Sequence, residues 1–451
     1  MSQTGSSPDG AGVDGSGQGG EGEQLQQTLS SSAVRYALGL LVVVYVFNFI
    51  DRSILSILLE PIKEEFHVSD TYLGFLSGIA FAAFYTLMGI PIARWADTGK
   101  RTRIIALAIF VWSGMTALTG AARSFAQLAM ARVGVGVGEA GCSPPAHSLI
   151  SDYYPPEKRA TALAIYALGI PIGSGIGNLT GGWINEWFDW RTAFVVVGLP
   201  GVALAVLVHF TLPEPVRGVY DDLATRSAKK KPVREVLGFI WGLRSFRHMS
   251  FASALHSFYA YGVAAFIAAF FMRSHALSSG ELGTWLAVIG CTGGVAGTFL
   301  GGYLSDRLSV SDVRWQMWVP AVATAISMPF AFLVYLWPDG RTALLLSFPG
   351  ALLGGMWMGP VFAATQTLVP PIMRATASAI LLFVINIIGL GLGPQGTGIV
   401  SDLLEPAYGI ESLRYSLLGV VVLFSSWSVF HFYMASRTFA EDLKAKQNLG
   451  D

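Results

Sequence analysis

Long apolar runs, separated by short polar segments, fill the chain from residue 34 to residue 435. Each run is close to the ~20 residues that an α-helix needs to cross a bilayer. The pattern predicts an all-α membrane protein with twelve membrane-spanning helices in two groups of six. The first six lie near residues 34–59, 72–93, 104–121, 125–150, 160–182 and 192–211, and the second six near residues 250–272, 281–303, 316–337, 343–368, 375–400 and 413–435.

The polar segments divide the chain into five predicted regions. Residues 1–32 are rich in Gly, Ser and Gln and have neither the apolar core nor the basic start of a signal peptide, so we expect a disordered tail. Residues 33–212 form the first six-helix half, 213–248 a central loop, 249–436 the second half and 437–451 a C-terminal tail.

The sequences of the two halves share motifs in the same order, which indicates an internal repeat. A Pro-Pro-x-x-Arg-Ala-Thr-Ala motif occurs at residues 155–162 and again at residues 370–377, and Asp97 after the second helix corresponds to Asp306 after the eighth. Because six is an even number, both copies run in the same direction across the membrane. Such parallel repeats are typical of secondary transporters, whose halves rock around a central site.

Composition agrees with a membrane protein and suggests few other partners. The chain is 53% hydrophobic and 13% charged, and its formal net charge is zero, so nothing indicates a nucleic-acid partner. Cys142 and Cys291 both lie in apolar runs and suggest neither a disulfide nor a metal site. The histidines lack metal-ligand spacing and there is no P-loop, so we expect no cofactor and no use of ATP.

Lys and Arg are distributed unequally between the two sides of the predicted bundle. The loops on the side that carries both termini hold twenty of them, and the opposite loops hold six. Cytoplasmic loops of membrane proteins carry such an excess. We therefore expect a multi-pass protein of the cell (inner) membrane with cytoplasmic N- and C-termini.

The fourth predicted helix carries two charges, Arg132 and Glu139, at membrane depth. A charge at the bilayer centre costs about 2.5 to 3.5 kcal/mol on insertion scales, so such residues usually face a cavity or a partner. Seven residues correspond to about 700° of helical rotation, so both side chains lie on one face about 10 Å apart. Gly134, Gly136 and Gly138 between them predict a close approach by a neighbouring helix.

The first helix carries a second charged pair, Asp51 and Arg52, one turn after Asn48. Counted at 1.5 Å per residue, Asp51 and Arg132 lie at matching depths, about 10 to 12 Å from the same end of the bundle. We therefore predict that Asp51 pairs with Arg132 and that Arg52 meets a substrate or Glu139. A purely structural charge network is the alternative.

The second half has no matching charges within its predicted spans, so the central site is expected to be asymmetric. A charged N-terminal wall would face an apolar, aromatic C-terminal wall, which suits an amphipathic molecule. For each single residue of that second wall, a lipid-facing or core position is the alternative. The residues considered are Phe251, Phe258, Tyr259, Tyr261, Phe266, Phe270, Phe271, Met356, Trp357 and Met358.

The stretch Ala93-Arg-Trp-Ala-Asp97-Thr-Gly-Lys-Arg101 and its copy around Asp306 resemble the loop signature of the major facilitator superfamily, except that Ala93 replaces a glycine. The resemblance implies a twelve-helix major facilitator fold. It also implies that Asp97 stabilises the inside-closed state by meeting the positive end of the helix that follows Arg374. The residues it assigns to gating are Asp97, Arg101, Arg159, Asp306 and Arg374.

More narrowly, Asn48-Phe-Ile-Asp51-Arg52 and the segment from Arg132 to Ala140 resemble the Spinster family of lipid transporters. The resemblance implies a bacterial member that transports a lysophospholipid or a sphingosine-1-phosphate-like lipid with protons, as a monomer among membrane lipids. It implies Asp51 and Glu139 as proton-coupling residues, and Arg52, Arg132, Glu139 and Asn48 as substrate-binding residues. Organic anion/proton symporters of the same superfamily share similar patterns and remain the alternative.

A membrane acyltransferase is a remote third reading. His147 and Asp152 have the spacing with which an aspartate orients a histidine general base in such enzymes. Because the pair falls at the predicted end of the fourth helix, helix termination is the ordinary explanation. The sequence therefore favours a transporter over an enzyme.

Overall fold

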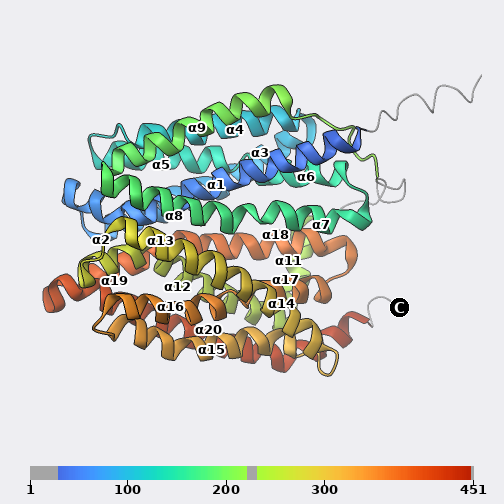
Figure 1. Cartoon of the computed structure of the whole chain (residues 1–451). Helices are drawn as coiled ribbons and strands as arrows, with labels where there is room; N and C mark the ends of the chain where they lie inside the picture. Colours follow the sequence, from blue (N-terminus) through green and yellow to red (C-terminus); the bar gives the residue numbers. More distant parts are fainter. Residues whose placement is uncertain (1–28, 221–230, 448–451) are drawn as a thin grey trace, which may run out of the picture.

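The computed structural model describes residues 29–220 and 231–447, and these residues form a helical bundle of two halves, drawn blue to green and yellow to red in Figure 1. Twelve membrane-length helices or joined helix segments are present in the described part of the chain, as the sequence predicts. In the N-terminal half they are α1 (Ser31–Phe66), α2 (Asp70–Ser77) with α3 (Ile79–Thr98), α4 (Arg101–Thr119), α5 (Phe125–Glu139) with α6 (Ser143–Tyr153), α7 (Pro156–Ala167) with α8 (Gly169–Trp187), and α9 (Trp190–Thr211).

The C-terminal half begins after a short helix in the central loop, α11 (Val233–Gly242). Its spans are α12 (Arg244–His275), α13 (Ser279–Ile289) with α14 (Val295–Ser309), α15 (Trp315–Leu336), α16 (Gly340–Gly354) with α17 (Met358–Leu368), α18 (Arg374–Ile385) with α19 (Leu392–Tyr408), and α20 (Ser412–Gln447). Short π-helical segments join α13 to α14 and α18 to α19.

Capping residues explain where several spans begin. Ser124, Asp189, Ser278 and Asp339 each accept a hydrogen bond from a backbone N–H three residues later, and α5, α9, α13 and α16 start directly after them. Such caps satisfy donors that a helix end leaves free and contribute about 1 kcal/mol each. Local sequence therefore fixes these helix starts before any packing between spans.

The repeat is visible in the backbone. His67 after α1 and Ala276 after α12 both adopt the left-handed conformation, and they lie 209 residues apart, the same offset that separates Asp97 from Asp306. The second, fourth and fifth spans of each half are interrupted, whereas the first, third and sixth are continuous. The two halves thus share their breaks as well as their helix order.

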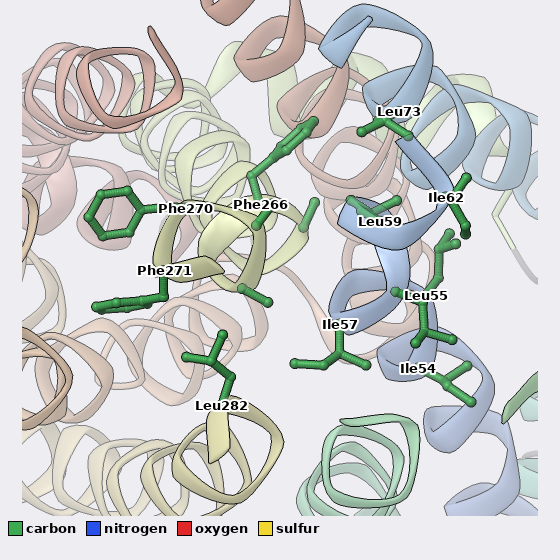
Figure 2. Packing of buried hydrophobic residues seen from close by; sticks show 14 of the residues in the cluster. Ile54, Leu55, Ile57, Leu59, Ile62, Leu73, Phe266, Phe270, Phe271 and Leu282 are labelled. Atoms are coloured by element: carbon green, nitrogen blue, oxygen red, sulfur yellow. The ribbon is translucent and has the colours of Figure 1, made fainter. Parts of the chain in front are cut away.

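The largest hydrophobic cluster of the described residues crosses between the halves at one end of the bundle. We call this end, where α1 joins α2, the Asp70 end, and the opposite end, where α3 joins α4, the Asp97 end. Figure 2 shows side chains of α1 and α2 facing side chains of α12 and α13 across this core. Toward the Asp97 end two further clusters lie mainly within one half each, although Leu390 of the C-terminal half joins the N-terminal cluster. The residues labelled in Figure 2 are Ile54, Leu55, Ile57, Leu59, Ile62, Leu73, Phe266, Phe270, Phe271 and Leu282.

Ion pairs also hold the halves together at the Asp70 end. Arg273 on α12 donates to Glu60 on α1 at 2.6 Å and to both carboxylate oxygens of Asp70 at 2.7 and 2.8 Å. Lys63 donates to Asp70 at 2.8 Å, and Asp402 on α19 accepts from the backbone N–H of Asp70 at 2.9 Å. Arg273 and Asp70 are almost completely buried, which makes this network a latch between the halves.

We expect Arg273→Gln to weaken closure at the Asp70 end. Removing one partner of a buried pair costs about 3 to 5 kcal/mol because the remaining charge is left uncompensated. Distances between spin labels on α1 and α12 should therefore shift toward a more open population. Arg341→Gln is the matched control, since Arg341 pairs with Glu281 within one half and is well exposed. Equal distance distributions in both variants would contradict the latch.

Candidate functional site

A cavity of about 600 Å³ lies between the halves, and both contribute to its wall. The N-terminal half places Arg52, Arg132 and Phe81 on it, and the C-terminal half places His256 and Tyr259 there. The volume lies in the range of small-molecule sites. It is therefore the natural place to look for a transported molecule.

Arg52 and Glu139 form an ion pair at the edge of this cavity. The Nε of Arg52 donates to Glu139 Oε2 at 2.6 Å, and the Glu139 side chain is completely buried while that of Arg52 is 19% exposed. The guanidinium carbon of Arg52 also lies 4.9 Å from the ring centres of Phe81 and Tyr85. Arg52 is thus held by one nitrogen and by aromatic faces, and its outer part lines the cavity.

The glycines of α5 allow Glu139 to reach this position. A Cβ at Gly136 would lie 2.7 Å from the carbonyl oxygen of Phe81 on α3, and one at Gly138 would lie 2.6 Å from the backbone nitrogen of Trp112 on α4. Only glycine permits two neighbouring backbones to approach so closely. α5 ends at Glu139, so the carboxylate lies at the interruption between α5 and α6.

Arg132 contacts Asp51 in a way that differs from the predicted pair. Its Nη1 lies 3.5 Å from the backbone carbonyl oxygen of Asp51, and its guanidinium carbon lies 4.6 Å from the ring centre of Phe81. Within the described residues the Asp51 carboxylate forms no ion pair with it. Matching depth did not fix the rotation of α1: neighbouring residues differ by about 100° around the helix axis, and Arg52 is the one that faces α5.

The other residues predicted for substrate binding and proton coupling lie behind the cavity wall. Asn48, Asp51 and Glu139 are all buried, with 1 to 2% of each residue exposed, whereas Arg52 and Arg132 line the cavity. The four charges at membrane depth on α1 and α5 are therefore gathered as predicted, but two cations, rather than acids, face the space that a substrate would fill.

Most of the ten residues considered for the second wall follow the alternative of a core or outward-facing position. Of the ten residues considered, Tyr259 and Tyr261 line the cavity. Phe266, Phe270 and Phe271 instead fill the core at the Asp70 end, and Phe251 and Met358 are exposed. An unbroken apolar run does not show which face of α12 points inward, so the pattern could not separate the cavity from the core. Phe330, Val334 and Tyr335 of α15 supply the apolar wall in their place.

His256 is a polar member of the wall that the sequence argument missed. The spacing of His256 to the other histidines does not indicate a metal site. The available signal was different: His256 is the one ionisable nitrogen base in the predicted span 250–272. An ionisable residue at membrane depth is itself an indication of function.

The predicted gating residues lie at the Asp97 end. Asp97, Asp306 and Arg374 are exposed, and Arg159 donates to the backbone oxygen of Ser151 at 2.9 Å. Because the halves are joined at the Asp70 end, the contact of Asp97 with the helix after Arg374 stays a prediction for the state in which the Asp97 end is closed.

Arg101 has partners within its own half. Its guanidinium pairs with Asp152 at the end of α6 and with Glu214 after α9, the latter at 2.8 Å. Burial alone would raise the pKa of Glu214, but hydrogen bonds from Thr102 and Arg101 hold that pKa below its usual range. Asp152 therefore serves this cluster, while the His147 ring packs edge-on against Tyr166, and no catalytic pairing of His147 with Asp152 is seen in this part of the structure.

Comparison with known proteins agrees with this architecture. The sequence pattern of the Major Facilitator Superfamily matches residues 41–394. An efflux pump of Mycolicibacterium smegmatis is 35% identical over 410 residues, covering 90% of this chain and 94% of that one. A sphingosine-1-phosphate transporter of Xenopus tropicalis is 26% identical, covering 92% and 83%.

A solved structure is similar over nearly the whole fold. It is the crystal structure of a bacterial homolog of the human lysosomal transporter Spinster, in an inward-facing and unoccupied conformation. Its TM-score is 0.83 at 33% identity, and the match covers 92% of this chain and 99% of that chain. The fold, the repeat and these matches together make the chain a member of the major facilitator superfamily, a family of transporters and not of enzymes, with a resemblance to its Spinster branch.

Proposed function

We propose that the protein is a proton-coupled secondary transporter of an amphipathic anionic lipid, of the lysophospholipid or sphingosine-1-phosphate type. One observation carries the proposal: a single cavity has two arginines on one wall and a mostly apolar lining elsewhere. A phosphate or carboxylate leaving water needs a cation to offset its desolvation. A hydrocarbon chain needs the apolar remainder, which includes Val263, Ile267, Leu286, Ile289, Phe330 and Val334.

Coupling to protons follows from competition for Arg52. Glu139 already occupies the Nε of Arg52, so a substrate anion and the Glu139 carboxylate compete for one guanidinium. Protonation of Glu139 removes the competitor and releases Arg52 for the anion. Proton and anion binding therefore favour one another, which is a reciprocal coupling between two sites. Asp51, buried beside Arg132, belongs to the same network.

We further place the protein in the cell (inner) membrane as a monomer, with both termini and the Asp97 end in the cytoplasm. The excess of Lys and Arg in the loops of that side supports this orientation. With the halves joined at the Asp70 end, the structure then corresponds to an inward-open state. Rocking of one half against the other would exchange it for the outward-open state.

Uptake into proteoliposomes tests the substrate class. We expect uptake of a lysophospholipid or of sphingosine-1-phosphate that increases when a proton gradient is imposed. Gradient-driven uptake of sugar acids or other small organic anions, with none of the lipids, would instead establish the organic anion symporter. Empty liposomes and liposomes without a gradient are the controls.

A further inference from the structure

The C-terminal wall of the cavity holds a histidine that neither the Arg52–Glu139 pair nor the latch uses. His256 lies on α12 with 1% of the residue exposed, and both it and Tyr259, one turn later, line the cavity. A buried imidazole without a structural salt bridge needs an explanation, because desolvation makes such a residue costly to keep in a membrane span.

The contacts of the imidazole define where its proton lies. Nε2 lies 3.2 Å from the carbonyl oxygen of Gly354, and Nδ1 lies 2.9 Å from the hydroxyl oxygen of Tyr259. A carbonyl only accepts hydrogen bonds, so Nε2 carries the proton of the neutral ring. Nδ1 is then the acceptor, and the Tyr259 hydroxyl donates to it.

The site also lies at a helix end that favours a cation. α16 ends at Gly354, α17 begins at Met358, and Gly354 and Gly355 line the cavity. The last carbonyls of a helix lack helical partners and carry a partial negative charge. His256 satisfies one of these carbonyls, and a protonated imidazole would be stabilised there more than a neutral one.

We propose that His256 and Tyr259 form a proton-operated binding site whose hydrogen-bonding sense reverses when His256 is protonated. With neutral His256, the Tyr259 O–H points at Nδ1 and offers only its lone pairs to the cavity. When a proton from water joins Nδ1, Nδ1 becomes a donor to the Tyr259 oxygen. The Tyr259 O–H must then turn away from Nδ1, which frees it to donate to an acceptor in the cavity.

This proposal rests on the proposed function, because it describes how the C-terminal wall of the same cavity binds the anion. The ionised oxygen atoms of a phosphodiester, sulfate or carboxylate group only accept hydrogen bonds. They are therefore bound by the protonated form and not by the neutral form. The C-terminal half would thus add a second proton-dependent contact to the one at Arg52.

The other neighbours of the imidazole are neutral. Thr324 on α15 places its hydroxyl oxygen 3.4 Å from Nδ1, and the Trp357 ring centre lies 5.1 Å from that of His256. Among the hydrogen-bond and ring partners of His256 in the described residues, Tyr259 alone can titrate. Tyr259→Phe therefore removes the reversible donor and leaves the imidazole in place.

A first measurement needs no ligand. Full-length protein labelled with ¹⁵N-histidine is placed in nanodiscs, and the imidazole nitrogens are followed by NMR between about pH 4 and pH 8. The signal lost in His256→Gln should show the Nε2–H tautomer at high pH and a doubly protonated ring at low pH. The Nδ1–H tautomer, or a ring that stays neutral throughout, would overturn the proposal.

A second measurement uses lysophosphatidylglycerol, whose phosphodiester keeps one charge over this pH range. Its Kd is measured in the Glu139→Gln background, which removes the competition at Arg52. Affinity should rise as pH falls, by up to about tenfold per pH unit for one linked proton. His256→Gln and Tyr259→Phe should each flatten this slope.

His248→Gln is the matched control: it changes a histidine of the same helix, which contacts His431 and does not line the cavity. It should keep the slope. An equal slope in all variants would overturn the proposal. Failure of the probe to bind to the wild-type protein would reject the lipid assignment instead, and the NMR titration would then decide the role of His256 alone.

Discussion

Replacement of Glu139 by glutamine is expected to abolish transport driven by a pH gradient while substrate binding and exchange stay measurable. Glutamine keeps the size and one acceptor oxygen but cannot take up a proton, and it competes only weakly for Arg52. The anion can therefore still bind, but no proton moves with it. Gradient-driven uptake and counterflow of labelled substrate, measured in the same proteoliposomes, separate the two effects.

The control for this experiment is Glu405→Gln, which makes the same chemical change at an exposed position on α19. It should leave both activities unchanged. Gradient-driven uptake at the wild-type rate in Glu139→Gln would return the buried charges to a structural role.

Asp51→Asn is expected to impair transport less completely, because Asp51 lies behind the wall and contacts Arg132 only through its backbone carbonyl.

Arg52→Ala is expected to reduce substrate affinity by about 30-fold or more. Loss of one partner from a buried, hydrogen-bonded charge pair costs about 2 to 5 kcal/mol, and 1.4 kcal/mol is a factor of ten in Kd. Arg52→Lys keeps the charge but loses the planar donors, so its affinity should lie between those of alanine and wild type. Binding to purified protein in nanodiscs measures all three.

Arg307→Ala, at an exposed position on α14, is the control for loss of a positive charge. Thermal unfolding should be recorded alongside, since removal of Arg52 leaves Glu139 without its partner. If affinity were unchanged in Arg52→Ala but lost in Arg132→Ala, the anion would bind to Arg132 alone. That outcome would also show that substrate binding does not involve the Arg52–Glu139 ion pair. It would contradict the proposed competition between the anion and Glu139 for Arg52.

The sequence was sufficient for the fold because the determining signals are local or periodic. Apolar length identifies the spans, caps such as Ser124 and Asp189 fix where they start, and the repeated motif relates the halves. The interruption between α5 and α6 was less evident, although Pro144 and Pro145 lie just beyond it. Which end of the bundle is closed was not predictable, since both closed states must be encoded by one sequence.

The site was predicted in part, for reasons that differ from residue to residue. Charge at membrane depth identified Arg52, Arg132 and Glu139, because such charges are costly wherever they lie. Pairing was harder: depth along a helix can be counted, but the rotation that turns Arg52 rather than Asp51 toward α5 depends on packing. The hydrogen bonding of His256 was not predicted, because its partner is the carbonyl of Gly354. Gly354 lies 98 residues away, at a helix end that the sequence does not mark.

The placement of the four membrane-depth charges beside the cavity on the N-terminal half has an electrical consequence. Arg52 and Arg132 balance Asp51 and Glu139 when every group is ionised, so the rocking of that half moves no net charge through the membrane field. One uncompensated charge would feel about 2.3 kcal/mol per 100 mV. When Glu139 takes up a proton and a monovalent anion binds at Arg52, the sum returns to zero. A cycle that carries one proton with one such anion is therefore electroneutral and insensitive to membrane voltage, whereas a second proton carried on His256 would add one charge that the voltage drives.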